Sequence, residues 1–364
     1  MVSDSSSLLY PALSAHHPLN SGLTHDSALI KAYRGERSDI LPVWFMRQAG
    51  RSLPEYRKLR EGTEMLESCL RPEMASEITL QPVRRHKVDA AIFFSDIVIP
   101  IKCAGVDVKI VPNVGPVLGE AVDTPQKVAN LPELDDAALD PIREAVALTV
   151  AELGSTPLIG FGGAPFTVAA YMVEGKPTRD HLGPRSMMHA DPETWHALAD
   201  WAGRVTAQFM RAQVEAGASA IQLFDSWAGS LSLKDYMEYA QPHSAKVFAD
   251  LDDLGVQKVH FGTGTGELLA GMKAAGADVI GVDYRIPLNV AAERVGTDTP
   301  LQGNIDPALL TAGWEPLKAD IDAVIAAGKN ALGHVLNLGH GVPPTTDPDV
   351  LTRIVEYIHA QPGR

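Results

Sequence analysis

Two arginines stand four residues apart in the segment WFMRQAGRSLPEYR. Arg47 and Arg51 follow an apolar run and flank Gly50, a residue type that lets the backbone approach a ligand closely. A guanidinium group is a planar fork that binds carboxylates and stays charged at any physiological pH. The pair therefore predicts a clamp for a substrate with several carboxylates, and the alternative is two surface arginines paired with a carboxylate such as Glu55.

A carboxylate follows a second apolar run, in the segment FFSDI, where Asp96 comes directly after Phe93, Phe94 and Ser95. A carboxylate that emerges from a buried strand into a cleft is partly desolvated, which raises its pKa, whereas nearby arginines lower it again. Asp96 is suited to accept hydrogen bonds from N–H groups or to balance the charge of a cationic intermediate. The alternative is an N-cap for the next element.

Three further segments place aromatic or polar side chains beside glycines. Tyr171 lies in GFGGAPFTVAAYMVEGK, where a core aromatic with a satisfied hydroxyl is the alternative interpretation. LFDSWAG carries Phe224 and Ser226 but lacks the G-x-S-x-G elbow, so Ser226 is not predicted to be a nucleophile. His340 stands between two glycines in NLGHG, which indicates an exposed loop that wraps around a ligand.

Eight short apolar runs, most of them separated by helical segments, are the elements expected to position these side chains. Continuous apolar runs are typical of parallel strands that are buried on both faces. We expect strands at residues 42–46, 89–95, 157–161, 219–225, 257–261, 278–283, 300–304 and 334–339. Eight strands that alternate with helices predict an α/β fold, a (β/α)8 barrel of the TIM type, and the alternative is a doubly wound open sheet.

Proline and aspartate residues mark where helices start or change. Asp191-Pro192 and Asp347-Pro348 are expected to open helices, because proline is favoured in the first turn. Pro82 and Pro242 are expected to kink or break the helices that contain them. Residues 107–118 are expected to form an inserted β-hairpin, which departs from a regular barrel.

The carboxyl ends of the predicted strands carry most of the polar residues of interest. In a (β/α)8 barrel these ends meet at one face and build the active site. We therefore expect most of the following to line one cleft: Arg47, Arg51, Ser95, Asp96, Asp225, Ser226, Asp283, Tyr284, Asn304 and His340.

The composition excludes some classes of partner. The chain has 364 residues, of which 45% are hydrophobic and 21% charged, and its formal net charge is −14. The sequence contains no basic run or stripe, so we expect no nucleic-acid partner. The net negative charge also opposes long-range capture of anions, so an anion site must be a local group of cations.

Targeting features and cysteines favour a cytoplasmic protein. The most apolar long run, Leu158 to Val173, contains Gly and Pro and is shorter than about 18 residues, so it is not predicted to span a membrane. The N-terminus lacks the features of a secretory signal. Cys69 and Cys103 form no CxxC motif, and we expect them to be reduced and structural. We expect a mobile tail at residues 1–20 and one barrel domain at residues 21–364.

The segment VHFGTGTGELLAGMKAAGADVIGVD supports a different interpretation, the nucleotide-binding half of a SAM-type methyltransferase with Asp283 on a ribose. Glu267 stands where a dinucleotide motif needs its third glycine. His260 lies near the place where a methyltransferase motif has an acidic residue. Because any strand–helix–strand unit of a barrel can imitate this pattern, we favour the barrel.

Two long segments, PVWFMRQAGRSLPEYR and GFGGAPFTVAAYMVEG, closely resemble the two diagnostic segments of the uroporphyrinogen decarboxylase family. FSDI, LFDSWAG, LQGNIDP and NLGHGV match further segments of that family in the same order. The resemblance extends from about residue 27 to about residue 360. It implies a single-domain, somewhat distorted barrel that forms a homodimer and uses no metal and no organic cofactor.

The resemblance also implies the activity, which is decarboxylation of the four acetate side chains of uroporphyrinogen III to methyl groups, giving coproporphyrinogen III in haem synthesis. Asp96, Arg47 and Arg51 are the implied catalytic residues. The implied substrate-binding residues are Arg47, Gln48, Ala49, Gly50, Arg51, Asp96, Tyr171, Phe224, Ser226 and His340. For the proton donor, a water, a substrate carboxylic acid and an arginine relay stay open, because arginine itself is a poor general acid.

Two other functions remain as alternatives. Zinc-dependent corrinoid or thiol methyltransferases share this barrel, but they need His and Cys ligands near the last strands. Both cysteines of this chain lie before residue 104, so the sequence offers His340 there without a thiol. The second alternative is a tetrapyrrole-binding protein without catalytic activity.

Overall fold

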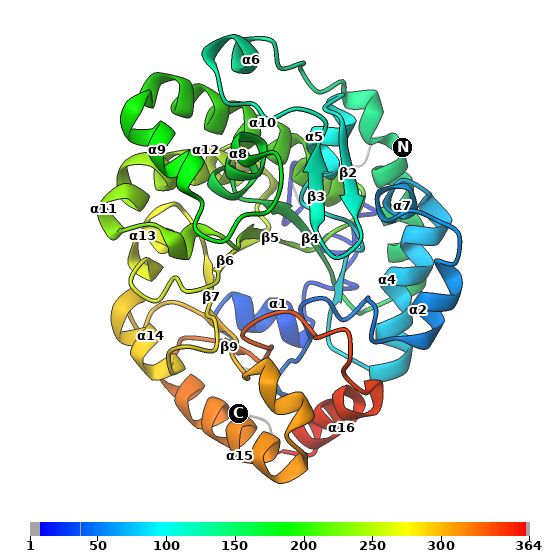
Figure 1. Ribbon diagram of the computed structural model, residues 1–364. Coiled ribbons are helices and arrows are strands. Elements are labelled where there is room, and N and C mark those ends of the chain that lie inside the picture. The colour runs from blue at the N-terminus through cyan, green and yellow to red at the C-terminus, as the bar shows by residue number, and fades with distance from the viewer. Residues whose placement is uncertain (1–7, 37, 362–364) are drawn as a thin grey trace.

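The computed structural model describes residues 8–36 and 38–361, and a curled sheet of parallel strands forms its centre, with helices around it (Figure 1). The strand order is β1-β4-β5-β6-β7-β8-β9, and every neighbouring pair is parallel. The strands are β1 (Ala91–Ile92), β4 (Leu158–Gly163), β5 (Ala220–Asp225), β6 (Gln257–Gly262), β7 (Val279–Gly281), β8 (Leu301–Gln302) and β9 (His334–Val335).

The first predicted strand, residues 42–46, lies between β9 and β1 without a full hydrogen-bonded ladder. Val43 forms a parallel bridge with Leu336, and the N–H of Trp44 donates to the carbonyl of Leu336 at 3.3 Å. On the other side, the N–H of Asp89 donates to the carbonyl of Val43 at 2.9 Å. This segment occupies the position of the eighth strand, so the predicted class, a distorted (β/α)8 barrel, is confirmed.

Helices pack around the sheet, and short 3-10 turns and one π-helical turn, Tyr236–Ala240, connect some of them. The helices are α1 (Ala28–Tyr33), α2 (Pro54–Leu59), α3 (Met65–Cys69), α4 (Pro72–His86), α5 (Ile99–Cys103), α6 (Pro125–Ala129), α7 (Asp140–Leu153), α8 (Pro165–Glu174), α9 (Leu182–Ala190), α10 (Pro192–Glu215), α11 (Leu233–Asp235), α12 (Gln241–Ala249), α13 (Leu269–Ala274), α14 (Leu288–Val295), α15 (Trp314–Ala327) and α16 (Pro348–His359).

The predicted helix starts are confirmed by their caps. The carboxylate of Asp191 accepts from the N–H of Thr194 at the start of α10, and that of Asp347 accepts from the N–H of Asp349 at the start of α16. The proline predictions have different outcomes. Pro82 lies inside α4, which continues through it to His86, whereas Pro242 lies in the first turn of α12, directly after the π-helical turn.

The predicted hairpin is present as β2 (Val108–Val111) and β3 (Gly115–Leu118), which pair antiparallel. It stands apart from the main sheet, beside the mouth of the barrel (Figure 1). The N-terminal segment packs more closely than a mobile tail at 1–20 would. Residues 1–7 lie outside the described residues, but Leu13 and Leu19 are buried, and His17 contacts the carbonyl of Val214 at 2.9 Å.

The inside of the barrel below the cavity carries a short polar chain. The hydroxyl of Tyr33 in α1 donates to Oε1 of Gln302 at 2.5 Å, and the indole N–H of Trp44 donates to the same oxygen at 3.1 Å. Gln302 in turn donates to Gln222 of β5 at 2.9 Å. Buried amides whose hydrogen bonds are satisfied in this way fix the geometry of a core. In the described part of the chain, no helix is both long and apolar enough to cross a membrane.

Candidate active site

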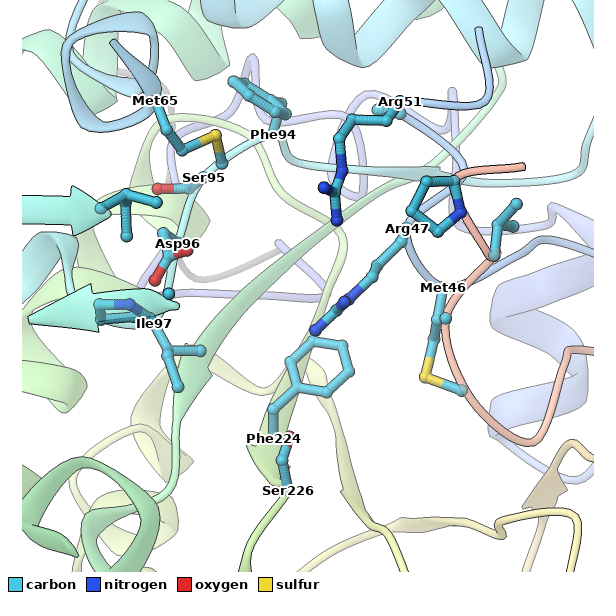
Figure 2. A pocket seen from close by; sticks show the side chains of 18 of the residues that line it. Met46, Arg47, Arg51, Met65, Phe94, Ser95, Asp96, Ile97, Phe224 and Ser226 are labelled. Atoms are coloured by element: carbon cyan, nitrogen blue, oxygen red, sulfur yellow. The ribbon is translucent and has the colours of Figure 1, made fainter. Parts of the chain in front are cut away.

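A cavity of about 1200 Å³ opens at the carboxyl ends of the strands. All of the predicted site residues except Gln48 line it, namely Arg47, Ala49, Gly50, Arg51, Asp96, Tyr171, Phe224, Ser226 and His340. In Figure 2 the side chains of Arg47 and Arg51 reach into the cavity from one side, and the carboxylate of Asp96 faces it from another. The structure thus brings the predicted cations and the predicted anion to one place.

Arg47 reaches the cavity because of an unusual turn after the segment 42–46. Its backbone φ is +61°, in the left-handed region that non-glycine residues rarely adopt. Gly341 from the last loop leaves room for its side chain, since a Cβ there would lie 2.4 Å from Cδ of Arg47. The chain therefore adopts an unfavourable backbone conformation at the residue whose guanidinium faces the cavity.

Neither Arg47 nor Arg51 forms an ion pair with a carboxylate of the described residues, and both side chains are exposed to the cavity. The alternative partner, Glu55, instead pairs with Arg85 at 2.8 Å. In water-filled space, an exposed guanidinium without a protein counter-ion is free to bind an incoming carboxylate. The two arginines are therefore available for an anionic ligand.

Asp96 lies in the turn between β1 and α5. Its Oδ1 accepts from the N–H of Val98 at 3.0 Å, so the capping role weighed as an alternative is present together with exposure to the cavity. Burial raises the pKa of the Asp96 carboxyl above its usual value, and the N–H of Val98 and the guanidinium of Arg47 oppose this rise. A carboxylate in this position is poorly solvated and interacts strongly with any cation placed beside it.

Tyr171 belongs to a stack of three rings at one wall of the cavity. Its ring stacks on Trp227 with centroids 3.8 Å apart, and His181 stacks on Trp227 at 4.1 Å. Burial and the nearby carboxylate of Asp96 raise the pKa of Tyr171 to about 12, while Arg47 opposes the shift. The phenol is therefore neutral at physiological pH and can donate one hydrogen bond.

The other walls of the cavity are mostly apolar. Phe224 packs edge-to-face on Phe161 at 5.5 Å and on Phe261 at 6.0 Å between centroids, and all three line the cavity. Ser226 follows Phe224 after one residue, and its carbonyl accepts from the hydroxyl of Thr263 at 2.6 Å. Apolar rings with a few polar groups among them are typical of small-molecule sites.

His340 lines the cavity from the loop after β9. Desolvation lowers the pKa of His340, and the positive charges of Arg47 and Arg285 lower it further. The imidazole is thus expected to be neutral near pH 7, so it can accept or donate a hydrogen bond without adding a positive charge.

Arg60 is a cavity residue that the sequence analysis missed. Its guanidinium donates to the hydroxyl of Tyr56 at 2.7 Å, to the hydroxyl of Ser68 at 3.1 Å and to the carbonyl of Thr63 at 3.1 Å. All of these partners are uncharged. Arg60 stands near Arg57 and Lys58 in one basic segment, and helical spacing alone does not tell which of them faces the cavity.

Other missed cavity residues belong to the inserted hairpin, whose residues 110–116 line the same space. The sequence predicted the hairpin but contained no signal for the side of the barrel it covers. Its turn includes Asn113 with a φ of +62° and Gly115 with a φ of +110°. Trp227 is a further missed residue, although it follows Ser226 directly.

Gln48 and four of the polar residues at strand ends, Asp225, Asp283, Tyr284 and Asn304, do not line the cavity. The side chain of Gln48 is fully buried and hydrogen-bonded to the backbone. Asp225 is also fully buried and accepts from the hydroxyl of Thr167 at 2.7 Å. Asp283 accepts from the N–H of Gly264 at 2.6 Å, and Asn304 donates to the carbonyl of Asp283 at 2.8 Å. Asp283 and Asn304 thus form hydrogen bonds with loop backbone, whereas Asp225 binds a side-chain hydroxyl.

The features required by the methyltransferase alternatives are not assembled. Asp283, the expected ribose ligand, is occupied by Gly264 and Arg285. Cys69 ends α3 and Cys103 ends α5, far in sequence from the last strands, and burial raises the pKa of the Cys103 thiol to about 11. Within residues 8–36 and 38–361, no group of three or more His, Cys, Asp or Glu is arranged to hold a metal ion.

Comparisons with known proteins show the family of the chain. The model of the family "Uroporphyrinogen decarboxylase (URO-D)" matches residues 24–361. A uroporphyrinogen decarboxylase of Arthrobacter sp. (strain FB24) is 68% identical over 339 residues, which cover 93% of this chain and 98% of that protein. A uroporphyrinogen decarboxylase of Leifsonia xyli subsp. xyli is 57% identical over 373 residues, covering 97% and 99%.

Among solved structures, a methyltransferase from Methanosarcina mazei has a TM-score of 0.76 with 19% sequence identity. The match covers 92% of this chain and 98% of that chain. At this identity the likeness concerns the fold alone. It supports the barrel and does not support the methyltransferase activity.

Proposed function

The chain belongs to the uroporphyrinogen decarboxylase family, and we propose that Asp96, Arg47 and Arg51 carry the reaction of that family in the cavity described above. The enzyme removes CO₂ from the four acetate side chains of uroporphyrinogen III and so forms coproporphyrinogen III. The observation that carries the assignment of residues is the joint presence of unpaired arginines and a desolvated aspartate on one cavity.

The chemical difficulty of the reaction lies in the electron pair left when CO₂ departs. Direct loss of CO₂ from a pyrrole acetate would leave a carbanion on the methylene carbon. Protonation of the adjacent pyrrole carbon first makes a cationic ring that accepts this pair as the C–C bond breaks. A second proton on the exocyclic methylene gives the methyl group, and loss of the first proton from the ring carbon restores the pyrrole. Each decarboxylation therefore consumes one proton overall and releases one CO₂ from one carboxylate.

Asp96 is proposed to stabilise the cationic ring. A carboxylate among the pyrrole N–H groups accepts their hydrogen bonds and holds the macrocycle in a domed shape around itself. Because burial has already removed much of its water, the carboxylate needs little reorganisation when positive charge develops on the ring. Preorganised groups of this kind contribute roughly several kcal/mol to transition-state stabilisation.

Arg47 and Arg51 are proposed to orient the substrate through its carboxylates. The substrate carries eight carboxylates, while the protein has a net charge of −14, so a local group of cations has to select it. The guanidinium groups are exposed to the cavity without a carboxylate partner in the described part of the chain. We propose that further hydrogen bonds to the substrate come from three uncharged side chains, those of Tyr171, Ser226 and His340.

The pyrrole ring supplies its own electron sink, so we propose that the reaction needs no metal and no organic cofactor. The apolar rings of Phe161, Phe224 and Phe261 suit the faces of a tetrapyrrole. For the whole protein, we propose one domain at residues 21–364, against which Leu13, His17 and Leu19 of the N-terminal segment pack, together with a cytoplasmic location and a homodimeric state. These last two proposals follow from the family resemblance and from the composition.

The test of the function is turnover of the reduced substrate. We expect the purified protein, incubated anaerobically with uroporphyrinogen III and no added metal, to release CO₂ and to form products with seven, six, five and finally four carboxylates. Chromatography of the oxidised porphyrins measures each product. Binding of the substrate without any loss of carboxylates would identify a tetrapyrrole-binding protein instead, and a requirement for zinc would favour the methyltransferase branch.

A further inference from the structure

Gln48 lies between two cavity residues in the sequence, but its side chain points elsewhere. Arg47 and Ala49 line the cavity, whereas Gln48 has no exposed surface and is absent from the lining. A fully buried carboxamide must have hydrogen-bond partners, because leaving it unpaired costs about 1–3 kcal/mol. Its partners therefore show what it does.

The carboxamide of Gln48 joins two strands of the barrel. Its Oε1 accepts from the N–H of Phe45 at 3.0 Å, and its Nε2 donates to the carbonyl of Ala90 at 3.0 Å. Phe45 belongs to the segment 42–46, and Ala90 directly precedes β1. A carboxamide offers the same donor and acceptor as a peptide group, so this side chain takes the place of a backbone rung.

The rung lies at a seam where the backbone ladder is incomplete. Next to the Gln48 contact, the segment 42–46 and the residues before β1 are joined by Asp89, whose N–H donates to the carbonyl of Val43. The carboxylate of Asp89 accepts from the N–H of Val43 at 2.8 Å. No strand pair joins the two segments in the described sheet. The seam is thus held largely by side chains.

The two segments that meet at this seam carry the two charges of the active site. The segment 42–46 leads directly into Arg47, and β1 leads into Asp96. Gln48 also closes the turn that sends Arg47 into the left-handed region, since its own N–H donates to the carbonyl of Phe45 at 3.0 Å. Its backbone and its side chain therefore hold the same residue, Phe45, from two sides.

On the opposite side of the segment, Asn337 adds a second anchor. Its Oδ1 accepts from the N–H of Met46 at 3.0 Å, and the N–H of Val342 donates to the carbonyl of Met46 at 2.8 Å. This side fixes the segment to the last strand. The position of Arg47 relative to β1, and so to Asp96, depends on the contact of Gln48 with Ala90 and on the contacts of Val43 with Asp89.

We propose that Gln48 is a positioning residue that sets the separation between the guanidinium of Arg47 and the carboxylate of Asp96 by bridging Phe45 and Ala90, and that it does not bind substrate. The proposal rests on the proposed roles of Arg47 and Asp96. It gives a different function to a residue that the family resemblance placed among the substrate ligands.

The first test replaces Gln48 with methionine, which keeps the length of the side chain and removes both hydrogen bonds. We expect kcat/KM to fall by roughly 10–100-fold, because a displacement of about 1 Å at a catalytic group has an effect of that size. Most of the loss should appear in kcat. Since Arg47 lowers the pKa of Asp96, a more distant guanidinium should also move the acidic limb of the kcat/KM profile to higher pH.

Gln213 provides a matched control. Its carboxamide is also fully buried, accepts from the N–H of Phe161 at 3.0 Å and donates to the carbonyl of Phe161 at 2.9 Å. Gln213→Met should lower the melting temperature about as much as Gln48→Met but leave the acidic limb in place. A loss of stability alone therefore cannot imitate the expected shift.

Gln48→Glu covers the case in which the methionine variant does not fold. A protonated carboxylic acid can accept from Phe45 and donate to Ala90 as the amide does, whereas the ionised form can only accept. The ratio of variant to wild-type activity should therefore rise as the pH falls. A ratio that does not change with pH would overturn the proposal.

Two further outcomes also decide the question. An increase in KM with unchanged kcat and an unchanged acidic limb would make Gln48 a substrate ligand, and wild-type kinetics in both Gln48 variants would remove any role. A different result would contradict the proposed function, namely full activity of the Asp96→Asn variant. An inactive Asp96→Asn with normal Gln48 variants would refute this inference alone.

Discussion

Two groups of charged residues follow the strands of this barrel, and they are treated in opposite ways. On the side of β1, Arg47, Arg51 and Asp96 face the cavity, and the two arginines have no carboxylate partner in the described part of the chain. On the side of β5 and β7, Asp225 and Asp283 are buried and bound to protein donors. Both groups occupy the same kind of position in the sequence.

The contrast shows that a position at a strand end does not make a residue functional. Asp283 holds the N–H of Gly264 and pairs with Arg285, so its charge is neutralised within the protein. Asp96 accepts one hydrogen bond from the N–H of Val98, and its carboxylate also faces the cavity. The difference between Asp283 and Asp96 is whether a cation of the protein itself pairs with the carboxylate.

The largest effect should come from exchanging the carboxylate on each side for an amide. Asp96→Asn should keep the fold and lower kcat by roughly 10²–10³-fold, because a preorganised charge at the reacting ring is removed. Asp225→Asn should mainly lower stability, by about 1–3 kcal/mol, because a buried hydrogen bond to Thr167 is disturbed. Single-turnover CO₂ release measures the rate of the reaction, and thermal unfolding measures stability. Near-normal turnover of Asp96→Asn would contradict the catalytic role of Asp96.

The Asp96→Asn variant should also differ from the wild type in how its unfolding free energy depends on pH. Burial raises the folded-state pKa of Asp96, so ionising this group destabilises the folded protein. This cost is absent below the unfolded-state pKa and grows as the pH rises to the folded-state pKa, above which it stays constant. Asp96→Asn removes the cost, so its unfolding free energy should exceed that of the wild type above this window and converge with it at lower pH. Chemical denaturation at several pH values tests the sign.

The second effect concerns the arginines. Arg47→Lys should lower kcat/KM by about 10–100-fold, since a point charge loses the second hydrogen bond of a fork and a charge-assisted bond contributes about 1.5–3 kcal/mol. Arg285 is the matched control, because it already pairs with Asp283 and lies over the ring of Tyr284 at 4.7 Å. Arg285→Lys should change kcat/KM little, and equal losses in both variants would contradict the distinction between free and paired cations.

Much of the fold followed from local patterns in the sequence. Each of the eight apolar runs lies in the sheet or at its seam, because buried parallel strands need continuous apolar residues. The cap at Asp191 and the hairpin at 107–118 depend on neighbouring residues, and both are present. The continuation of α4 through Pro82 was not predicted, since the packing of a long helix can outweigh the loss of one hydrogen bond.

The site was harder to predict where it depends on the direction in which a side chain points. The segment 47–51 was placed as a whole on the substrate, but the left-handed turn at Arg47 points Gln48 into the core while Arg47 faces the cavity. Arg60 faces the cavity because Tyr56, Ser68 and Thr63 hold it there, and no sequence pattern encodes that arrangement. Tertiary contacts, rather than residue type, decide which of these residues face the cavity and which are buried.

The smallest effect compares two tyrosines. Tyr171 lines the cavity beside Asp96 and Arg47, and its hydroxyl is available to a carboxylate of the substrate. Tyr171→Phe should raise KM by about 2–10-fold, as expected for one neutral hydrogen bond of about 0.5–1.5 kcal/mol, and its stack on Trp227 should keep the ring in place.

The hydroxyl of Tyr236 is buried near Asp225 and has no hydrogen-bond partner among the described residues. Tyr236→Phe should therefore leave KM unchanged and leave stability equal or higher. A larger kinetic effect at Tyr236 than at Tyr171 would show that buried groups behind β5 act on the reaction, and the two sides of the barrel would no longer differ in the way described here.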